Sequence, residues 1–472
     1  MIINFPELLG SGIIFLIFLL FKRKVFAACQ YNLQKIFIDF ITDSLKVFFK
    51  MESDMKIKRR IVMEKYYRKA ALFGILMSIL WVLLVNTQPF SDFAYYDGLA
   101  RQIAAGGPWG DTYTSVGYPV VLGLVYRIFG SSLAAAKIFN LTLTFVNYVL
   151  FYKILKKADL SEKRRKFTYG LFVVFPSNIF YNSILAGEIL FTAILLLITF
   201  LYFYDVKHKY ILIGVLTAAG AMVKPFFLGF FLLVFIVELC FKMKFSAVLK
   251  HSIIVFIISA VAISPWLYRN TRLLGQFTFI SNNGGIVLYV NNNSQNRYGL
   301  WMDARNVRNS VVKKTEYINA NATDKNKMLS RAARKWIKAH PAEFVQLGFK
   351  RLFITYIGFS EIDYSFNGAN VNPIFKFIFS FYAYAARYVV FVPAVVMLLV
   401  YSVITIKGFS GKKSVDRYSI YNLICFYMFA LVYFISEGQP RYSFPCTFIM
   451  IYFFSCFAER FNFIKSAKSV KL

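Results

Sequence analysis

Long apolar runs separated by short basic segments dominate the chain from residue 70 onward. The runs are about 17–22 residues long, which is the length that an α-helix needs to cross the hydrocarbon core of a bilayer. We predict membrane spans near 70–87, 133–153, 168–184, 188–204, 210–223, 226–241, 247–267, 380–406, 418–435 and 443–459. The predicted fold class is an all-α polytopic membrane protein, a bundle of about 10–11 transmembrane helices with two large extracytoplasmic loops that contain juxtamembrane helices.

The composition agrees with this pattern. Of the 472 residues, 58% are hydrophobic and only 17% are charged, whereas soluble domains are nearer half apolar and a quarter charged. This excludes a disordered, fibrous or simple soluble protein. The net charge of +32 would indicate nucleic acid as the partner of a soluble protein. Here the short cytoplasmic loops of a membrane protein explain most of the excess, and anionic lipid or phosphate explains the rest, so no nucleic-acid partner is expected.

The basic loops predict the topology. The segments 153–166, 205–209, 242–250 and 407–417 and the tail after 459 carry lysine and arginine and fall on one side, which is therefore cytoplasmic. Two large loops, 88–132 and 268–379, then lie outside. The second is also basic, but loops longer than roughly 60 residues cross the membrane largely regardless of charge.

The chain accordingly divides into four parts. Residues 1–69 form an N-terminal extension with a possible extra helix and a basic cytoplasmic segment, and 70–267 form an N-terminal transmembrane module that includes the first outer loop. Residues 268–379 are the large outer loop, and 380–472 are C-terminal transmembrane helices with a basic cytoplasmic tail. Met55 precedes a basic cluster and would be a natural start, which leaves open whether residues 1–54 belong to the functional protein.

The cysteines and histidines indicate neither a disulfide framework nor a metal centre. The five cysteines are scattered without a C-x-x-C pair, and four of them lie in or beside apolar runs, as buried thiols do. His208, His251 and His340 are far apart in sequence, so a histidine-rich metal cluster is not expected. We predict that the protein requires no metal and no cofactor.

Asp92 is the first candidate for chemistry. It follows the helix that ends near Thr87, and a carboxylate beside an apolar helix end is suited to take a proton from a hydroxyl. The alternative is that Ser91 or Asp92 caps a short helix through Ala105. Asp97 could be the base instead, or an exposed surface residue.

Glu188 and Lys224 lie at predicted outer turns. Glu188 either complements the dipole of the helix that it begins or faces the first-loop carboxylate across a cavity, because ionisable groups at membrane depth are functional candidates. Lys224 precedes Pro225 in an otherwise apolar stretch. Its ammonium group either reaches toward the interface or binds a phosphate.

Two arginines at outer helix ends complete the set. Arg269 follows Trp266 just past the end of a span, and Arg441 precedes the last span. A guanidinium in such a place can hold a lipid phosphate with two hydrogen bonds, or it can mark the membrane interface. Residues 118–126 predict a helix lying along the outer membrane surface, and residues 326–346 predict an amphipathic helix with Arg331, Arg334, Lys335 and Lys338 on its polar side.

The order of these pieces resembles the bacterial family-39-type glycosyltransferases of the GT-C superfamily, relatives of the protein O-mannosyltransferases and of the lipid A aminoarabinose transferase. The resemblance covers roughly residues 70–460. It is carried by Asp92 with Tyr96, Gly117-Tyr118-Pro119, Glu188, Lys224-Pro225, Pro265-Trp266-x-x-Arg269-Asn270, the stretch from Asn282 to Gly299, and Arg441-Tyr442. Two departures from the family pattern are Phe93, where many relatives carry a second acid, and Lys224, where many carry arginine.

The resemblance implies a GT-C-type bundle in a bacterial cytoplasmic membrane, with the active site facing outward. It implies that Asp92 is the catalytic base and that Lys224, Arg269 and Arg441 bind the phosphate of a polyprenyl-phosphate sugar. Further substrate-binding residues would be Tyr96, Asp97, Glu188, Asn270 and Tyr442. The implied acceptor is a hydroxyl on a glycan, lipid or protein, and direct displacement would invert the anomeric centre.

A transporter or flippase of lipid-linked sugars is the alternative, because the same charged groups could line a transport pathway. Alternating access usually rests on internal repeats, and the chain shows none. The large outer loops favour the enzyme.

Overall fold

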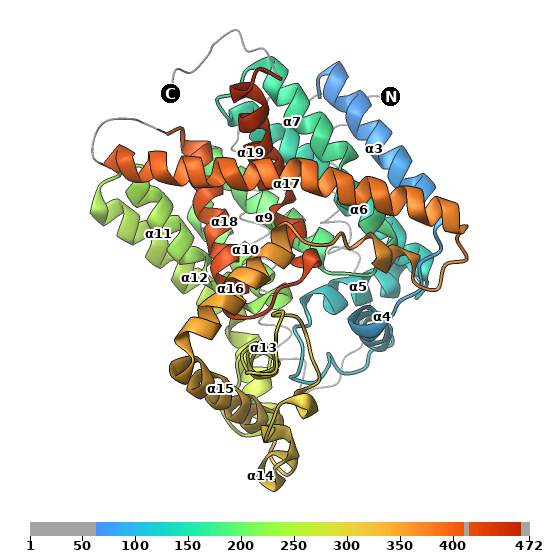
Figure 1. Ribbon diagram of the computed structural model, residues 1–472, viewed down its shortest axis with the longest axis vertical. Coiled ribbons are helices and arrows are strands. Elements are labelled where there is room, and N and C mark those ends of the chain that lie inside the picture. The colour runs from blue at the N-terminus through green and yellow to red at the C-terminus, as the bar shows by residue number, and fades with distance from the viewer. Residues whose placement is uncertain (1–62, 410–414, 464–472) are drawn as a thin grey trace.

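The computed structural model describes residues 63–409 and 415–463, and most of the N-terminal extension, with its possible extra helix, lies outside these ranges. Every regular element within them is a helix (Figure 1), which confirms the all-α class. The α-helices are α3 (Lys65–Leu84), α4 (Ser91–Ala104), α5 (Gly117–Phe129), α6 (Leu133–Lys157), α7 (Glu162–Val174), α8 (Pro176–Phe180), α9 (Glu188–Phe203), α10 (Lys209–Val223), α11 (Phe230–Cys240), α12 (Phe245–Leu274), α13 (Gly284–Asn291), α14 (Thr315–Ile318), α15 (Ala322–Ala339), α16 (Pro341–Tyr356), α17 (Pro373–Phe409), α18 (Arg417–Ile435) and α19 (Thr447–Arg460).

Among the described residues, six stretches are long and apolar enough to cross a membrane: α3, α6, α12, α17, α18, and α19 together with the 3₁₀ helix η7 (Pro440–Cys446) that precedes it. They correspond to six of the ten predicted spans. The predicted spans at 188–204, 210–223 and 226–241 are also apolar helices, but they are shorter, at 10–17 residues. The protein is therefore an all-α membrane protein.

The predicted span at 168–184 is wrong as a continuous helix. Helix α7 ends at Val174, and the chain restarts at Pro176 as the short helix α8, followed by the 3₁₀ helix η2 (Tyr181–Ser183). The residue before a proline is driven out of the α region, and Phe175 has the extended angles φ −63° and ψ 130°. An apolar run long enough to span is thus folded into three short pieces.

A second proline changes the predicted amphipathic helix at 326–346. Helix α15 begins earlier, at Ala322, and ends at Ala339, because Pro341 starts the separate helix α16. The helix predicted near residue 118 is present as α5. It buries Tyr118, Leu122 and Tyr126 against the helices around it.

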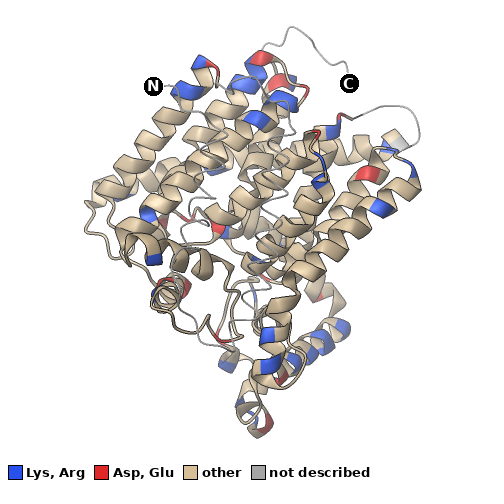
Figure 2. Ribbon diagram, turned by 180° about the vertical axis from the view of Figure 1, so that it is seen from behind, with Lys and Arg blue, Asp and Glu red and all other residues tan. Residues whose placement is uncertain are grey.

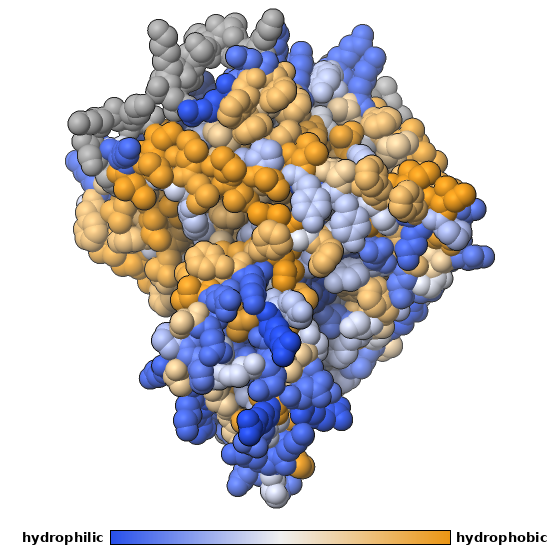
Figure 3. All heavy atoms as spheres, in the orientation of Figure 1, coloured by the Kyte–Doolittle hydropathy of each residue, from blue (hydrophilic) through white to orange (hydrophobic). Residues whose placement is uncertain are grey.

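A belt of apolar residues crosses the face of the helix bundle that Figure 3 shows. Apolar side chains such as Leu83 (73% exposed), Phe377 (71%) and Ile406 (69%) point outward from α3 and from both ends of α17, and Figure 3 shows the orange belt that such residues form. Helices with exposed apolar faces are solvated by lipid rather than water. Helix α19, in contrast, lies inside the bundle, and Ile449, Met450 and Ile451 are completely buried.

Residues 276–340, which we call the outer subdomain after the predicted topology, lie beyond this belt. Its helices α13 and α15 enclose a small core of their own, in which Tyr289, Val290, Leu329 and Ala333 are buried. Hydrophilic residues cover its surface in the lower part of Figure 3, and Figure 2 shows lysine and arginine along it. Helix α16 leads the chain from this subdomain back to the bundle.

The predicted topology is tested by labelling single cysteines from outside intact cells, in a background with Cys29 and Cys240 replaced by serine. Lys335→Cys lies on the outer subdomain and Lys207→Cys lies between α9 and α10, and both positions are exposed. We expect a membrane-impermeant maleimide to label the first and not the second. Labelling of Lys207→Cys alone would invert the topology.

Candidate functional site

Asp92 and Arg441 form an ion pair although they are 349 residues apart in the chain. The Nη2 atom of Arg441 donates to Oδ2 of Asp92 at 2.8 Å. The carboxylate side chain is 51% exposed, whereas the guanidinium side chain is only 13% exposed. The pair therefore exposes its carboxylate to the surroundings and keeps its guanidinium sheltered.

The backbone at the start of α4 places Asp92 beside Arg441. Phe90, the residue before the helix, is extended, and Ser91 takes a positive φ of 46°, so the chain turns sharply into the helix. The capping alternative for Ser91 and Asp92 is wrong: the N-cap position is Phe90, and no side chain caps the helix. Asp92 lies in the first turn, where its charge also suits the helix dipole.

The segment before α4 is held from two sides. The Thr87 hydroxyl lies within hydrogen-bond distance of two buried acceptors, the Ser183 hydroxyl at 2.8 Å and the Ser365 carbonyl. The buried ammonium of Lys137 donates to the Thr87 carbonyl at 3.2 Å. These contacts fix the chain just upstream of Asp92.

Glu188 and Lys224 form a second pair behind the first. Lys224 Nζ lies 3.5 Å from Glu188 Oε1, and the carboxylate side chain is 4% exposed. Glu188 begins α9 and Lys224 directly follows α10, so two helix ends meet here. The Lys224 ammonium also lies 5.1 Å from the centre of the Tyr442 ring, which links this pair to the residue after Arg441.

Aromatic rings line the space between the pairs. The Arg441 guanidinium lies 5.6 Å from the centre of the Phe93 ring and 5.4 Å from that of Tyr442. Phe93, the departure from the family pattern, therefore supplies a cation–π contact where an acid would supply charge. Burial raises the pKa of the Tyr96 hydroxyl, with Arg441 opposing and Asp92 and Glu188 adding to the rise, so Tyr96 stays protonated and can donate a hydrogen bond.

Glu437 holds the turn that carries Arg441. Its two carboxylate oxygens accept hydrogen bonds from Gln439 Nε2 at 2.7 Å and from the Tyr442 hydroxyl at 2.8 Å. The Tyr442 ring in turn stacks on Tyr433 of α18, with centroids 5.1 Å apart. The turn is therefore closed by its own side chains and packed against the bundle.

Arg351 of α16 joins three segments at the same turn. Its side chain is completely buried, and its guanidinium donates to the carbonyls of Phe434 (2.6 Å) and Ile435 (3.1 Å) at the end of α18. It also donates to the carbonyl of Asn291 and to Oδ1 of Asn292 in the outer subdomain. Burial lowers the pKa of Arg351 to about 10, and the converging carbonyls compensate for the buried charge.

Arg387 of α17 likewise joins separate segments of the chain at the turn that carries Arg441. Its guanidinium pairs with Glu361 at 3.1 Å, donates to Ser443 Oγ at 3.0 Å and donates to the Thr355 carbonyl. Both members of the ion pair are buried. Burial raises the pKa of Glu361, and the positive charge of Arg387 opposes the shift.

Two residues predicted to bind substrate, Arg269 and Asn270, contact main-chain carbonyls. Arg269 donates to the carbonyls of Trp109 (3.4 Å), Gly110 and Asp111 (3.2 Å) in the first outer loop, and it stacks on Trp266. Asn270 is buried and donates to the Phe279 carbonyl at 2.8 Å. The structure thus places the Arg269 guanidinium on main-chain oxygens.

Asp97 also lies apart from the cluster. It pairs with Arg101 at 2.7 Å, one helical turn along α4, and accepts a hydrogen bond from the Tyr126 hydroxyl. The structure therefore brings together Asp92, Tyr96, Glu188, Lys224, Arg441 and Tyr442 of the predicted residues, and leaves Asp97, Arg269 and Asn270 in other contacts.

Sequence reasoning missed Glu361, Arg387, Arg351 and Glu437. Arg387 had a signal, because a cation within a predicted apolar span is rarely accidental. Arg351 and Glu361 lie in the large outer loop among many other charged residues, where nothing in the sequence distinguishes them.

Within the described residues, no group of three or more histidine, cysteine or acidic side chains could hold a metal ion. Cys240, Cys425, Cys446 and Cys456 are free thiols. Comparison with known proteins adds no relative, since no family model, curated protein or solved structure matches the chain.

The framework around Arg441 is tested at Gly438. A Cβ atom there would lie 2.6 Å from the Arg351 Cα atom, which belongs to the backbone and cannot swing away. We expect Gly438→Ala to destabilise the protein by about 1–3 kcal/mol, measured as a lower thermal unfolding midpoint in detergent.

Gly98→Ala is the matched control. Gly98 is exposed within α4, with no atom near its Cβ position. Alanine should therefore increase the free energy of unfolding by about 0.5–1 kcal/mol through its higher helix propensity, and the unfolding midpoint should rise. Equal effects of the two substitutions would contradict a close-packed turn at Gly438.

Proposed function

We propose that the protein is a membrane glycosyltransferase that moves a sugar from a polyprenyl-phosphate-linked donor to an acceptor hydroxyl at the outer face of a bacterial cytoplasmic membrane. The observation that carries the proposal is the contact between Asp92 and Arg441, a half-exposed carboxylate beside a sheltered guanidinium. A carboxylate can accept the proton of an attacking hydroxyl, and a guanidinium binds phosphate with paired hydrogen bonds. Both halves of the transfer therefore have a suitable group in one place.

In this proposal the donor phosphate competes with Asp92 for the Arg441 guanidinium, and Lys224 supplies a second positive charge. Loss of its ion pair frees the Asp92 carboxylate to act as the base. The acceptor oxygen attacks the anomeric carbon, and its proton passes to Asp92. The bond from the anomeric carbon to the phosphate oxygen breaks, and its electron pair leaves on the phosphate, where the fixed cations stabilise the charge. Direct displacement inverts the anomeric centre.

The remaining residues of the cluster fit the sugar and the loop. We assign Tyr96 and Glu188 to the sugar hydroxyls, because one donates and the other accepts hydrogen bonds. We assign Tyr442 to the wall of the site, and Arg269 to holding the 109–111 segment of the first outer loop, since its guanidinium is already engaged there.

Asp92→Asn is the first test. We expect it to reduce sugar transfer by about a hundred- to ten-thousand-fold, the usual contribution of a general base. The measurement is transfer of labelled sugar from a panel of polyprenyl-phosphate hexoses and pentoses by purified protein, with cell-envelope extract as the acceptor. A flippase would leave the glycosidic bond of the donor intact.

Asp97→Asn is the matched control on the same helix. Because Asp97 contacts Arg101 and Tyr126 and not the cluster, transfer should stay within a few-fold of the wild type. Full activity of Asp92→Asn, or an equal loss in both variants, would remove Asp92 as the base.

Donor binding is tested at Arg441. We expect Arg441→Gln to weaken the binding of polyprenyl phosphate by about tenfold to a hundredfold, the effect of losing a charge-assisted hydrogen bond. The affinity of Arg441→Lys for polyprenyl phosphate should lie between those of the wild type and Arg441→Gln, since lysine keeps the charge but lacks the planar guanidinium. The measurement is stabilisation of the protein against heat by polyprenyl phosphate.

Two controls separate binding from chemistry in that experiment. Arg101→Gln removes an arginine of α4 that pairs with Asp97, and Asp92→Asn removes the proposed base; both should retain stabilisation by polyprenyl phosphate. Undiminished stabilisation of Arg441→Gln would place the donor phosphate elsewhere.

A further inference from the structure

The outer subdomain carries a positive charge that the proposed reaction does not use. Residues 276–340 contain eleven lysines and arginines against three acids. Two of the acids are already paired, Asp303 with Arg305 and Asp324 with Lys327. Since the subdomain has its own small core, the excess lies on the surface of a folded unit.

Four of these cations form a stripe on α15. Arg331, Arg334, Lys335 and Lys338 are all exposed, and their spacing of three, four and seven residues places them on one face of the helix. None of the four forms an ion pair with any residue that the structure describes. Like charges at this spacing destabilise a helix, and an anionic ligand would relieve the repulsion. Figure 2 shows the stripe along α15.

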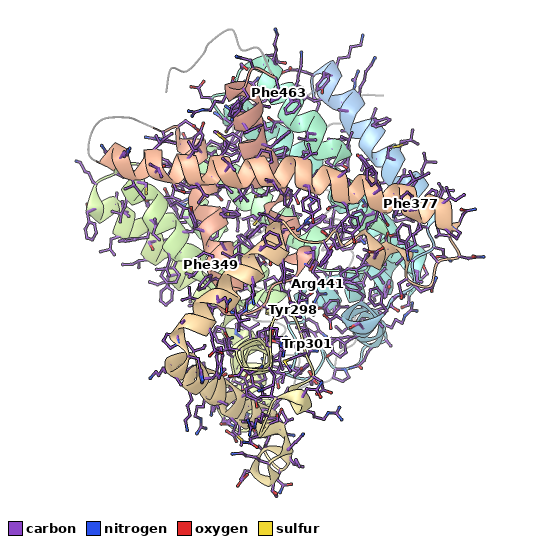
Figure 4. The ribbon with its side chains drawn as sticks, viewed as in Figure 1. Tyr298, Trp301, Phe349, Phe377, Arg441 and Phe463 are labelled. Carbon is purple, nitrogen blue, oxygen red and sulfur yellow. The ribbon has the colours of Figure 1, made fainter. Side chains whose placement is uncertain are left out.

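Two exposed aromatic rings of this subdomain belong to the loop that follows α13. Tyr298 is 67% exposed and Trp301 is 51% exposed, and Figure 4 labels both between Arg441 and α13. Exposed Tyr and Trp side chains offer large, rigid contact surfaces at a low cost in conformational entropy. The pair is therefore suited to pack against a sugar ring.

The loop that carries these rings is held by its own hydrogen bonds and is joined to the turn before α19. Asn296 Oδ1 accepts hydrogen bonds from the Tyr298 and Gly299 amides at 3.2 and 2.6 Å. The Gly299 carbonyl accepts a hydrogen bond from the Gly438 amide at 3.1 Å, three residues before Arg441. Gly299 has a φ of +73° and lies against Arg351, so this join needs glycine.

We propose that the outer subdomain binds an anionic polysaccharide, a chain with repeating carboxylate or phosphate groups, as the acceptor of the transferred sugar. This inference rests on the glycosyltransferase function proposed above and names the acceptor class of that site. The α15 stripe holds the anionic groups, Tyr298 and Trp301 hold a sugar ring, and the chain continues toward Asp92.

The arrangement of charge favours a polymer over a lipid surface. Besides the stripe, exposed cations lie in the segment from 305 to 314, namely Arg305, Arg308, Lys313 and Lys314. That segment lies next to α14, which forms the lower end of the molecule, beyond the apolar belt (Figures 1 and 3). A flat bilayer surface would contact only the cations that lie at the level of its headgroups. A flexible polysaccharide chain can contact both the α15 stripe and the cations of the segment from 305 to 314.

The test uses the full chain in phosphatidylcholine nanodiscs and two probes, alginate as an anionic polysaccharide and inorganic polyphosphate as a polymer without sugar. We expect both to bind and neutral dextran not to bind. Substituting Arg331, Arg334 and Lys335 together by glutamine should lower both affinities about tenfold and flatten their dependence on salt, because fewer counterions are released.

The matched control removes three exposed cations from the predicted cytoplasmic side, Lys163, Lys207 and Lys250, also by glutamine. It should change both affinities by less than about twofold, because it alters only long-range charge. An equal loss in both triple variants would attribute binding to net charge alone and overturn the proposal. Displacement of the polymers by phosphatidylglycerol in the disc would show that the stripe faces lipid, and would overturn it too.

Trp301→Ala separates the sugar contact from the charge. It should weaken alginate about two- to tenfold, the range expected for loss of a ring contact, and leave polyphosphate unchanged. An equal change in the affinities for alginate and polyphosphate would show that Trp301 does not contact a sugar ring.

These measurements need no sugar transfer. Polymer binding that depends on the α15 stripe, in a protein without transferase activity, would keep the binding surface and reject the proposed function. Transfer that proceeds in a protein whose polymer binding ignores the stripe would keep the proposed function and reject the anionic acceptor.

Discussion

Two buried arginines determine where the charged cluster can form. Arg351 and Arg387 lie on different helices, and each donates to main-chain carbonyls of segments that are far apart in the chain. A buried guanidinium is costly unless its donors are satisfied, so these segments cannot separate without exposing an uncompensated charge to an apolar interior. Both arginines act on residues 434–443, the stretch that carries Arg441 to Asp92.

The cluster itself alternates charge. Asp92 pairs with Arg441 and Glu188 pairs with Lys224, while Tyr442 lies beside both cations. The inner acid is buried and the outer acid is half exposed. An arriving anion can therefore displace the outer carboxylate at little structural cost, whereas the inner pair stays in place. In the proposed reaction, this asymmetry favours Asp92 over Glu188 as the group that accepts the proton.

A hydrogen bond between two backbone segments connects the outer subdomain to this cluster. The hydrogen bond between Gly438 and Gly299 joins the turn before α19 to the loop of Tyr298 and Trp301, and Arg351 packs against both glycines. A ligand held on the subdomain and a ligand held at Arg441 would thus share one rigid segment. Such a segment sets the distance between two substrates without a moving part.

The sequence by itself determined the helical class, the six long apolar helices of the described residues and most of the residues of the charged cluster, because apolar run length and charge are local signals. It could not show that Pro176 would fold one apolar run into three pieces, since length alone reads as a span. It also could not separate Arg441 from Arg269, two arginines at outer helix ends. Only the tertiary structure decided that one meets a carboxylate and the other meets main-chain carbonyls, because partners from opposite ends of the chain set the surroundings of each guanidinium.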